Sequence, residues 1–317
     1  MVLKIRKKEL TTWEMLDILS RHLGIRQRDI GYAGLKDKHA MTIQYISIMA
    51  THAPKLEDFT HPQIKILDRI RHNNKIRIGH LKGNRFHLRF KKVLGVQKEM
   101  LDSVLAWIKE HGAPNYFGHQ RFGMYGDNWQ EGQKILSGEL KMRDRKNRAF
   151  LISAYQSYLF NNWLSKRIEL CRLLEDFSET EAEEVLKLPE GTLAGSKKQK
   201  NFFKILEGDL LMHYPYGRIF YAEELPKEAE RFGERDLSVT GLIPGKKVKL
   251  AEGAAREIEQ AFDEEIRENG SRRYAWIFPT EIRGKYIPEK AHYELGFFLP
   301  KGCYATNVVD LLRGTRE

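Results

Sequence analysis

The chain has 317 residues, 41% of them hydrophobic, which is enough for about two domains with hydrophobic cores of their own. Its 54 lysines and arginines against 43 acidic residues give a net charge of +11, which favours a polyanionic partner such as nucleic acid. The sequence has no signal peptide, no apolar run long enough to span a membrane and only two, widely spaced cysteines. We therefore expect a cytoplasmic protein without disulfides, a membrane anchor or a zinc site.

The N-terminal part of the chain predicts alternating strands and a helix. The expected elements are a short strand at 3–7, a helix over 11–23, and strands at 29–34 and 42–50. Thr11 and Glu14 have the spacing of a capping box, and Gly24 follows the apolar stripe of the helix as a stop signal. The last strand is apolar on both faces toward its end, which predicts that it is covered there on both sides.

The loop Leu35–Met41 between the last two strands holds a single acid, Asp37, between Lys36 and Lys38. Cations beside a carboxylate favour its ionised form. An ionised carboxylate can act as a nucleophile or a base without a metal. A charged turn in an ordinary hairpin has the same pattern, so the spacing alone leaves both interpretations open.

The segment from Arg69 to Lys98 contains ten lysines and arginines and no acidic residue. Within it, residues 85–91 alternate between apolar and basic or histidine side chains, which predicts a strand with one wet, positive face. We expect Arg85 and Arg89 on that face to contact phosphate, because no acid within the segment neutralises them. An ordinary solvated strand face is the alternative interpretation.

Helices are expected over 97–111, 129–137 and 149–174, acidic helices at 175–190 and 252–268, strands within 208–222, 237–250 and after Arg273, and a strand, turn and helix over 297–312. The Gly-rich, aromatic stretch 113–123 is typical of a binding site rather than of regular structure. Composition shifts near residue 140, which suggests a domain boundary. No P-loop, dinucleotide fingerprint, metal-ligand spacing or nucleophile elbow is present.

The segment around Asp37 also resembles a known family. Residues 31–44, GYAGLKDKHAMTIQ, are similar to the signature of the TruD family of tRNA pseudouridine synthases. Three further segments agree in the family's order, HLKGNRF at 80–86, NYFGHQRFG at 115–123 and FLPKGCYAT at 298–306, with a weaker match at 153–161. Four long motifs in one order are far more specific than any short pattern.

The resemblance implies an α+β fold. Its catalytic domain, with a mixed, mostly antiparallel sheet and flanking helices, would comprise residues 1–140 and 284–317. An inserted α/β domain, the TRUD domain, would comprise residues 141–283. Family members usually begin with a further segment, which supplies a strand and a basic residue paired with the catalytic aspartate. The resemblance implies that this chain lacks that segment.

The resemblance implies isomerisation of uridine 13 of tRNA to pseudouridine, with Asp37 as the catalytic nucleophile or base. Phe117 would stack on the extruded base and Asn115 would shape the same wall. Further residues implied in RNA binding or loop support are Lys36, Gln44, Arg85, Arg89 and Arg121, with Thr42 beside the loop. The partner is tRNA, no cofactor or metal is needed, and a monomer is expected. The alternatives are a non-catalytic tRNA-binding or chaperone protein and an RNA hydrolase that uses Asp37 as its base.

Overall fold

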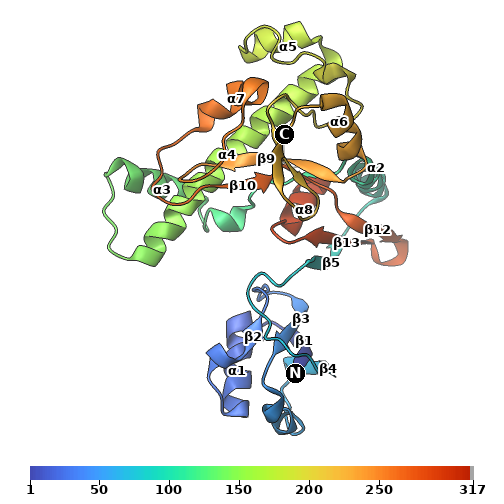
Figure 1. Ribbon diagram of the computed structural model, residues 1–317. Coiled ribbons are helices and arrows are strands. Elements are labelled where there is room, and N and C mark those ends of the chain that lie inside the picture. The colour runs from blue at the N-terminus through green and yellow to red at the C-terminus, as the bar shows by residue number, and fades with distance from the viewer. Residues whose placement is uncertain (315–317) are drawn as a thin grey trace. The chain divides into compact units, whose positions relative to one another are not determined.

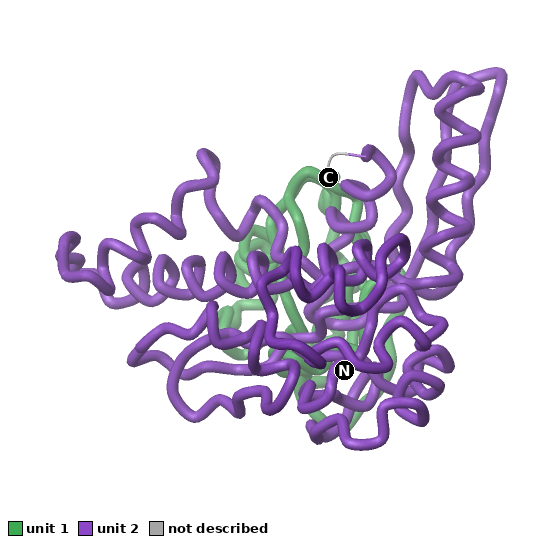
Figure 2. The backbone as a smooth tube through the Cα atoms, turned by 90° about the horizontal axis from the view of Figure 1, so that it is seen from above, with its two compact units in different colours: residues 1–84 green, residues 85–317 purple. Residues whose placement is uncertain are grey.

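The computed structural model describes residues 1–314 and has two compact units, which meet in the chain between Asn84 and Arg85. Figure 1 labels the helices and strands, and Figure 2 colours the two units separately. Each unit has a hydrophobic core of its own and is described here by itself.

The first unit is an antiparallel sheet covered on one face by a helix. The sheet has the order β2-β3-β1-β4, with β1 (Val2–Lys8), β2 (Gly31–Tyr32), β3 (Met41–Ser47) and β4 (Ile64–Ile70). Helix α1 (Thr12–Leu23) packs its apolar stripe on Leu3, Ile5 and Ile46 of the sheet. Short 3₁₀ turns lie at Gln27–Asp29, Ala50–His52 and Pro54–Leu56.

The predicted ends of helix α1 are confirmed. The Thr11 hydroxyl accepts the Glu14 N–H at 3.0 Å, and the Glu14 carboxylate accepts the Thr11 N–H at 2.6 Å. Gly24 ends the helix with a φ of +66°, a left-handed conformation that costs glycine little.

Strand β3 is covered on both sides only at its end. Ile46 and Ser47, which point to opposite faces, are buried, as predicted for this end of the strand. Closer to its start, Gln44 is buried but Ile43 and Tyr45, on the face opposite to Gln44, are each 48% exposed. Apolar residues on both faces of a strand therefore do not prove that both faces are covered.

Part of the second unit is built on a three-stranded sheet of order β12-β13-β5. Its strands are β5 (Gly83–Lys91), which starts within the first unit, β12 (Thr280–Ile287) and β13 (His292–Pro300), and its helices are α2 (Gly95–His111) and α8 (Ala305–Arg313). The predicted alternation along β5 is confirmed, because Phe86 stacks on Phe297 with ring centroids 5.4 Å apart while Arg85 and Arg89 are exposed. A short antiparallel pair joins β6 (Ala113–Pro114) and β11 (Trp276–Ile277).

The rest of the second unit packs around the long helix α4 (Arg145–Asp176), which runs along a four-stranded sheet (Figure 1). That sheet has the order β10-β9-β7-β8, with β7 (Leu210–His213), β8 (Ile219–Tyr221), β9 (Leu237–Ile243) and β10 (Ser271–Tyr274). The other helices are α3 (Asn128–Ser137) alongside α4, α5 (Glu179–Leu186), α6 (Leu225–Gly233) and α7 (Gly253–Glu259). Further 3₁₀ turns lie at His119–Arg121, Ser196–Lys198, Gln260–Phe262 and Pro288–Lys290.

The predicted α+β class is confirmed, with antiparallel pairing between the paired strands of every sheet for which a register is defined. The acidic helix predicted over 252–268 is wrong in length, because α7 ends at Glu259 and is followed by a single 3₁₀ turn. No helix within residues 1–314 combines the length and the apolar character needed to cross a bilayer.

Candidate functional site

The Asp37 loop leads from β2 into β3, and its acidic side chain is exposed. Within residues 1–314, no donor forms a hydrogen bond with the Asp37 carboxylate. The loop is instead tied to the first unit through its backbone. The backbone that carries Asp37 is thus held in place, while the carboxylate oxygens stay accessible.

Lys7 of β1 supplies one of these ties. Its side chain is 0% exposed, and Nζ donates to the carbonyl of Leu10 at 2.5 Å and to that of Asp37 at 2.8 Å, with a longer contact of 3.4 Å to the carbonyl of Lys36. Burial lowers the pKa of Lys7, an effect that the charges of Asp37 and Glu14 oppose. A buried lysine that binds backbone carbonyls is rare, and here it fixes the loop from inside.

The second tie runs through Thr12 of α1. Its hydroxyl accepts the backbone N–H of Lys36 at 2.9 Å and lies 3.5 Å from Gln44 Oε1. Gln44, which is 7% exposed, completes the chain by donating to Met15 Sδ at 3.4 Å. These contacts give Gln44 a supporting position beneath the loop. Thr42 lies opposite Lys7 across the strand pair, and its buried hydroxyl has no partner among residues 1–314.

The lysines beside Asp37 have partners of their own. Lys36 Nζ donates to the side chain of Asn84, and burial lowers the pKa of Lys36, an effect that the charge of Asp37 opposes. Lys38 forms an ion pair with Glu14 at 3.1 Å. Asn84 belongs to the second signature segment, so the first two signature segments lie in contact.

Glu14 joins the helix cap to the Asp37 loop, which gives a pH-dependent prediction. The hydrogen bond from the Thr11 N–H, followed by that from Lys38, lowers the pKa of Glu14 to about 2. A depressed carboxylate pKa stabilises the fold above its unfolded value, near 4.5, and this contribution is lost as the pH falls toward 2. We expect Glu14→Gln to lower the melting temperature at pH 7, with a difference from the wild type that shrinks below pH 4.5. Glu57→Gln, at an exposed site, is the control, and a difference independent of pH would contradict the assignment.

A second cluster lies in the second unit, around the guanidinium group of Arg273. It donates to the carbonyl of Asn115 at 3.1 Å, to the side-chain oxygen of Asn115 at 2.8 Å and to the carbonyl of Gly302 at 2.8 Å. It also covers the ring of Phe117, 4.0 Å from the ring centroid, and lies 5.5 Å from that of Tyr304. Arg273 therefore joins the third signature segment to the last one. A Cβ at Gly118 would lie 2.7 Å from the hydroxyl of Thr306, so these segments also pack closely.

The weaker matching segment on α4 completes the second cluster. The Asn161 side chain accepts the Phe117 N–H at 2.8 Å and donates to the Phe117 carbonyl at 3.0 Å. Ser153 and Ser157, spaced by one helical turn, accept hydrogen bonds from Arg121 at 2.8 and 3.1 Å. One face of α4 thus holds the segment that carries Phe117 and Arg121.

Asn115 and Phe117 are 2% and 8% exposed, which places both in the packed interior. Phe117 meets Phe160 edge-to-face, with centroids 5.6 Å apart, in addition to its contact with Arg273. Packing in the hydrophobic core accounts for these contacts. Stacking of Phe117 on a nucleobase stays a prediction, because only 8% of the residue is exposed in this conformation.

The basic face of β5 is partly neutralised, which corrects the expectation drawn from its local sequence. Arg85 forms a bidentate ion pair with Glu281 at 2.7 Å, and Arg89 pairs with Glu294 at 2.7 Å. Both acids come from strands about 200 positions later in the chain. A count of charges within the segment 69–98 therefore does not include them. Exposed pairs of this kind are weak, so phosphate can compete for the arginines.

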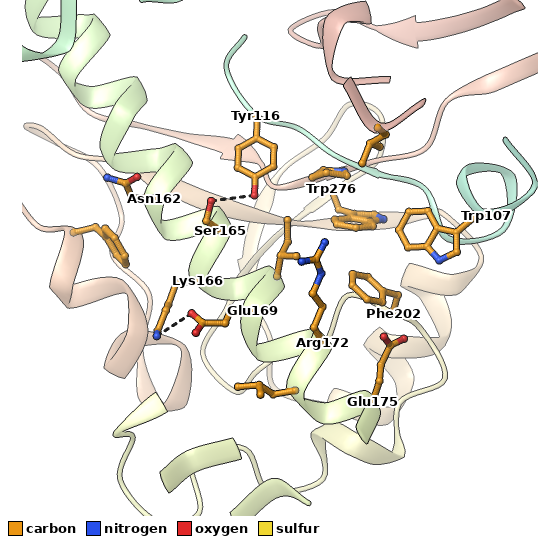
Figure 3. A pocket seen from close by; sticks show the side chains of 15 residues that line it. Trp107, Tyr116, Asn162, Ser165, Lys166, Glu169, Arg172, Glu175, Phe202 and Trp276 are labelled. Atoms are coloured by element: carbon orange, nitrogen blue, oxygen red, sulfur yellow. Dashed lines mark hydrogen bonds and ion pairs between the residues drawn. The ribbon is translucent and has the colours of Figure 1, made fainter. Parts of the chain in front are cut away.

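A cavity of about 720 Å³ also opens in the second unit (Figure 3). Trp107, Tyr116 and Phe202 line it, and charged side chains of both signs, among them Arg172 and Glu175, lie at its wall. The cavity takes in Tyr116 but neither of its neighbours in the chain, Asn115 and Phe117. No candidate residue predicted from the sequence lies in its lining.

Comparison with known proteins agrees with the signature segments. The family model described as "tRNA pseudouridine synthase D (TruD)" matches residues 1–146 and 191–311. The chain belongs to the TruD family. Curated proteins named tRNA pseudouridine synthase D are similar over 98% of this chain: that of Wolinella succinogenes is 52% identical and that of Nitratiruptor sp. 51%, with 87% and 86% of their lengths covered.

A solved structure has the same fold. It is that of the putative tRNA pseudouridine synthase D from Methanosarcina mazei, with a TM-score of 0.69, 20% identity and coverage of 98% of this chain and 87% of the other. In this TruD-family chain the matched segments form two clusters, one at the Asp37 loop and one at Phe117. Sequence reasoning missed Lys7 and Arg273. Lys7 is in phase with the inward residues Leu3 and Ile5 of β1, a signal that could have revealed its burial.

Proposed function

We propose that this chain is a tRNA pseudouridine synthase that acts on uridine 13, with Asp37 as its catalytic carboxylate. The observation that carries the proposal is the exposed Asp37 side chain, which stands on a loop fixed by Lys7 and Thr12 in a chain of the TruD family. The assignment of tRNA as the substrate rests on the names of the relatives and on the resemblance to the family signature.

The reaction breaks the glycosidic bond between N1 of uracil and the sugar, turns the base and joins its C5 to the same sugar carbon. C5 then loses its proton and N1 gains one, so atoms and electrons balance without a redox cofactor. An anionic Asp37 can attack the sugar or remove a sugar proton, and either role needs oxygens that the substrate can reach, as the exposed Asp37 side chain provides.

We also propose that residues 1–140 and 284–317 form the catalytic domain and that 141–283 form the inserted domain. The hydrophobic clusters within the second unit support this division. One includes Leu105, Tyr293 and Leu299, while the other is built mainly from residues 160–278. The compact units divide the chain at a different place, after Asn84.

Incubation of the wild-type chain with unmodified tRNA transcript tests the function. We expect pseudouridine at position 13, detected by carbodiimide mapping, and release of tritium from [5-³H]uridine. Binding without modification would favour the chaperone alternative. A strand break or an abasic site would favour the hydrolase alternative, and both outcomes would contradict the proposal.

A further inference from the structure

The second cluster contains two guanidinium groups without an acidic partner. Within residues 1–314, neither Arg121 nor Arg273 forms an ion pair with a carboxylate. Both lie against the same aromatic ring, since the Arg121 guanidinium is 5.8 Å and that of Arg273 is 4.0 Å from the centroid of Phe117. Both side chains are partly withdrawn from solvent.

Two neighbouring guanidinium groups without an acidic partner cost folding free energy. Burial lowers the pKa of Arg273 to about 10 and also lowers that of Arg121, and the charge of Arg121 adds to the effect on Arg273. The two groups thus repel each other where water screens them poorly. Buried charges in proteins are normally compensated by an opposite charge. Two arginines with almost fully buried side chains follow that rule, because Arg167 pairs with Asp209 at 2.7 Å and Arg272 with Glu259 at 2.5 Å.

The two arginines differ in which of their N–H groups lack an acceptor. Arg273 donates hydrogen bonds to backbone carbonyls and to the side chain of Asn115, and so connects two loops. Arg121 is bound through Nε and Nη2 to Ser157 and Ser153. Its Nη1 has no acceptor among the residues that the structure describes, and so offers two N–H groups to a ligand.

The surroundings favour a nucleotide as that ligand. The Arg121 guanidinium lies 5.8 Å from the centroid of Phe150, which is 43% exposed and so available to stack on a base. A planar guanidinium suits a phosphate group in charge and geometry.

We infer that Arg121 binds a backbone phosphate of the RNA substrate, with Arg273 as a positioning residue that adds positive charge and holds the Phe117 segment. The inference rests on the proposed action on tRNA and adds a specific phosphate contact to it. Each such contact changes the slope of log affinity against log salt by about 0.7–0.9.

The test is a salt titration of binding to unmodified tRNA by wild type and Arg121→Gln. We expect the variant to lose about 10- to 100-fold in affinity at low salt and its slope to fall by about one phosphate contact. Arg256→Gln is the matched control: it removes the same charge from the same unit, but Arg256 is already paired with Asp263. We expect its slope to equal that of the wild type. Equal slopes for wild type and Arg121→Gln would overturn the inference, as would an equal loss in both variants.

A second measurement varies the RNA and compares wild type with Arg121→Gln. Neutral methylphosphonate linkages are placed one at a time around the target uridine of an RNA stem-loop. We expect one position to weaken binding by wild type but not by the folded Arg121→Gln variant. The inference would be overturned if neutralising each linkage in turn left binding unchanged. It would also be overturned if inorganic phosphate saturated the protein without any effect on RNA binding. Pseudouridine formation by the wild type is scored separately, so a failure of the phosphate contact is distinct from a failure of the proposed function.

Discussion

Replacement of Asp37 by Asn is expected to reduce pseudouridine formation by at least about 1,000-fold, because the amide can neither attack the sugar nor remove a proton. The fold should survive, since the Asp37 tie to the rest of the unit uses its backbone carbonyl and Lys7. Affinity for tRNA should change little. Single-turnover assays and filter binding measure the two quantities separately.

Asp29→Asn is the matched control for that substitution. Asp29 is a partly exposed acid of the same unit, paired locally with Arg26 at 3.1 Å, and its replacement changes the net charge equally. We expect wild-type turnover from this control. Persistent modification by Asp37→Asn would refute the catalytic assignment, whatever the control does.

The second large effect is expected at Lys7. Lys7→Met removes the donor shared by the carbonyls of Leu10 and Asp37, and the buried Leu10 carbonyl left unpaired costs about 1–3 kcal/mol. The freed loop should misplace the carboxylate, and a shift of about 1 Å lowers turnover by up to about 100-fold. We therefore expect kcat to fall by about 10- to 100-fold with KM for tRNA almost unchanged.

The measurement for Lys7→Met is steady-state kinetics well below its melting temperature, together with thermal unfolding. Lys8→Met is the control, because Lys8 is the next residue of the same strand but is exposed. A purely structural role would lower stability and leave kcat per folded molecule intact, and that result would remove Lys7 from the site.

The sequence predicts features that depend on neighbours in the chain. The capping box of Thr11 and Glu14, the stop at Gly24 and the alternation along β5 are local patterns, and the structure confirms them. The Asp37 loop was also placed correctly between two strands. Gln44 contacts Thr12 and Met15, while its role at the site stays a prediction.

Features that depend on distant partners could not be predicted in this way. The acids that pair with Arg85 and Arg89 come from β12 and β13, so a count of charges within one segment overstated its positive face. Arg273 contacts Asn115 from 158 residues away, and no local pattern marks it. The exposure of Ile43 and Tyr45 likewise depends on what covers the sheet rather than on the strand itself.

The hydrogen bond from Lys7 to the backbone of the Asp37 loop has an evolutionary consequence. Since the backbone ties of the loop do not involve the carboxylate, we expect one codon change at this position to leave the fold and RNA binding intact while, on the proposed role of Asp37, it abolishes modification. On that proposal, a gene duplicate needs a single step to become an RNA-binding protein without activity. An engineer can install other reactive groups at the same point without rebuilding the scaffold.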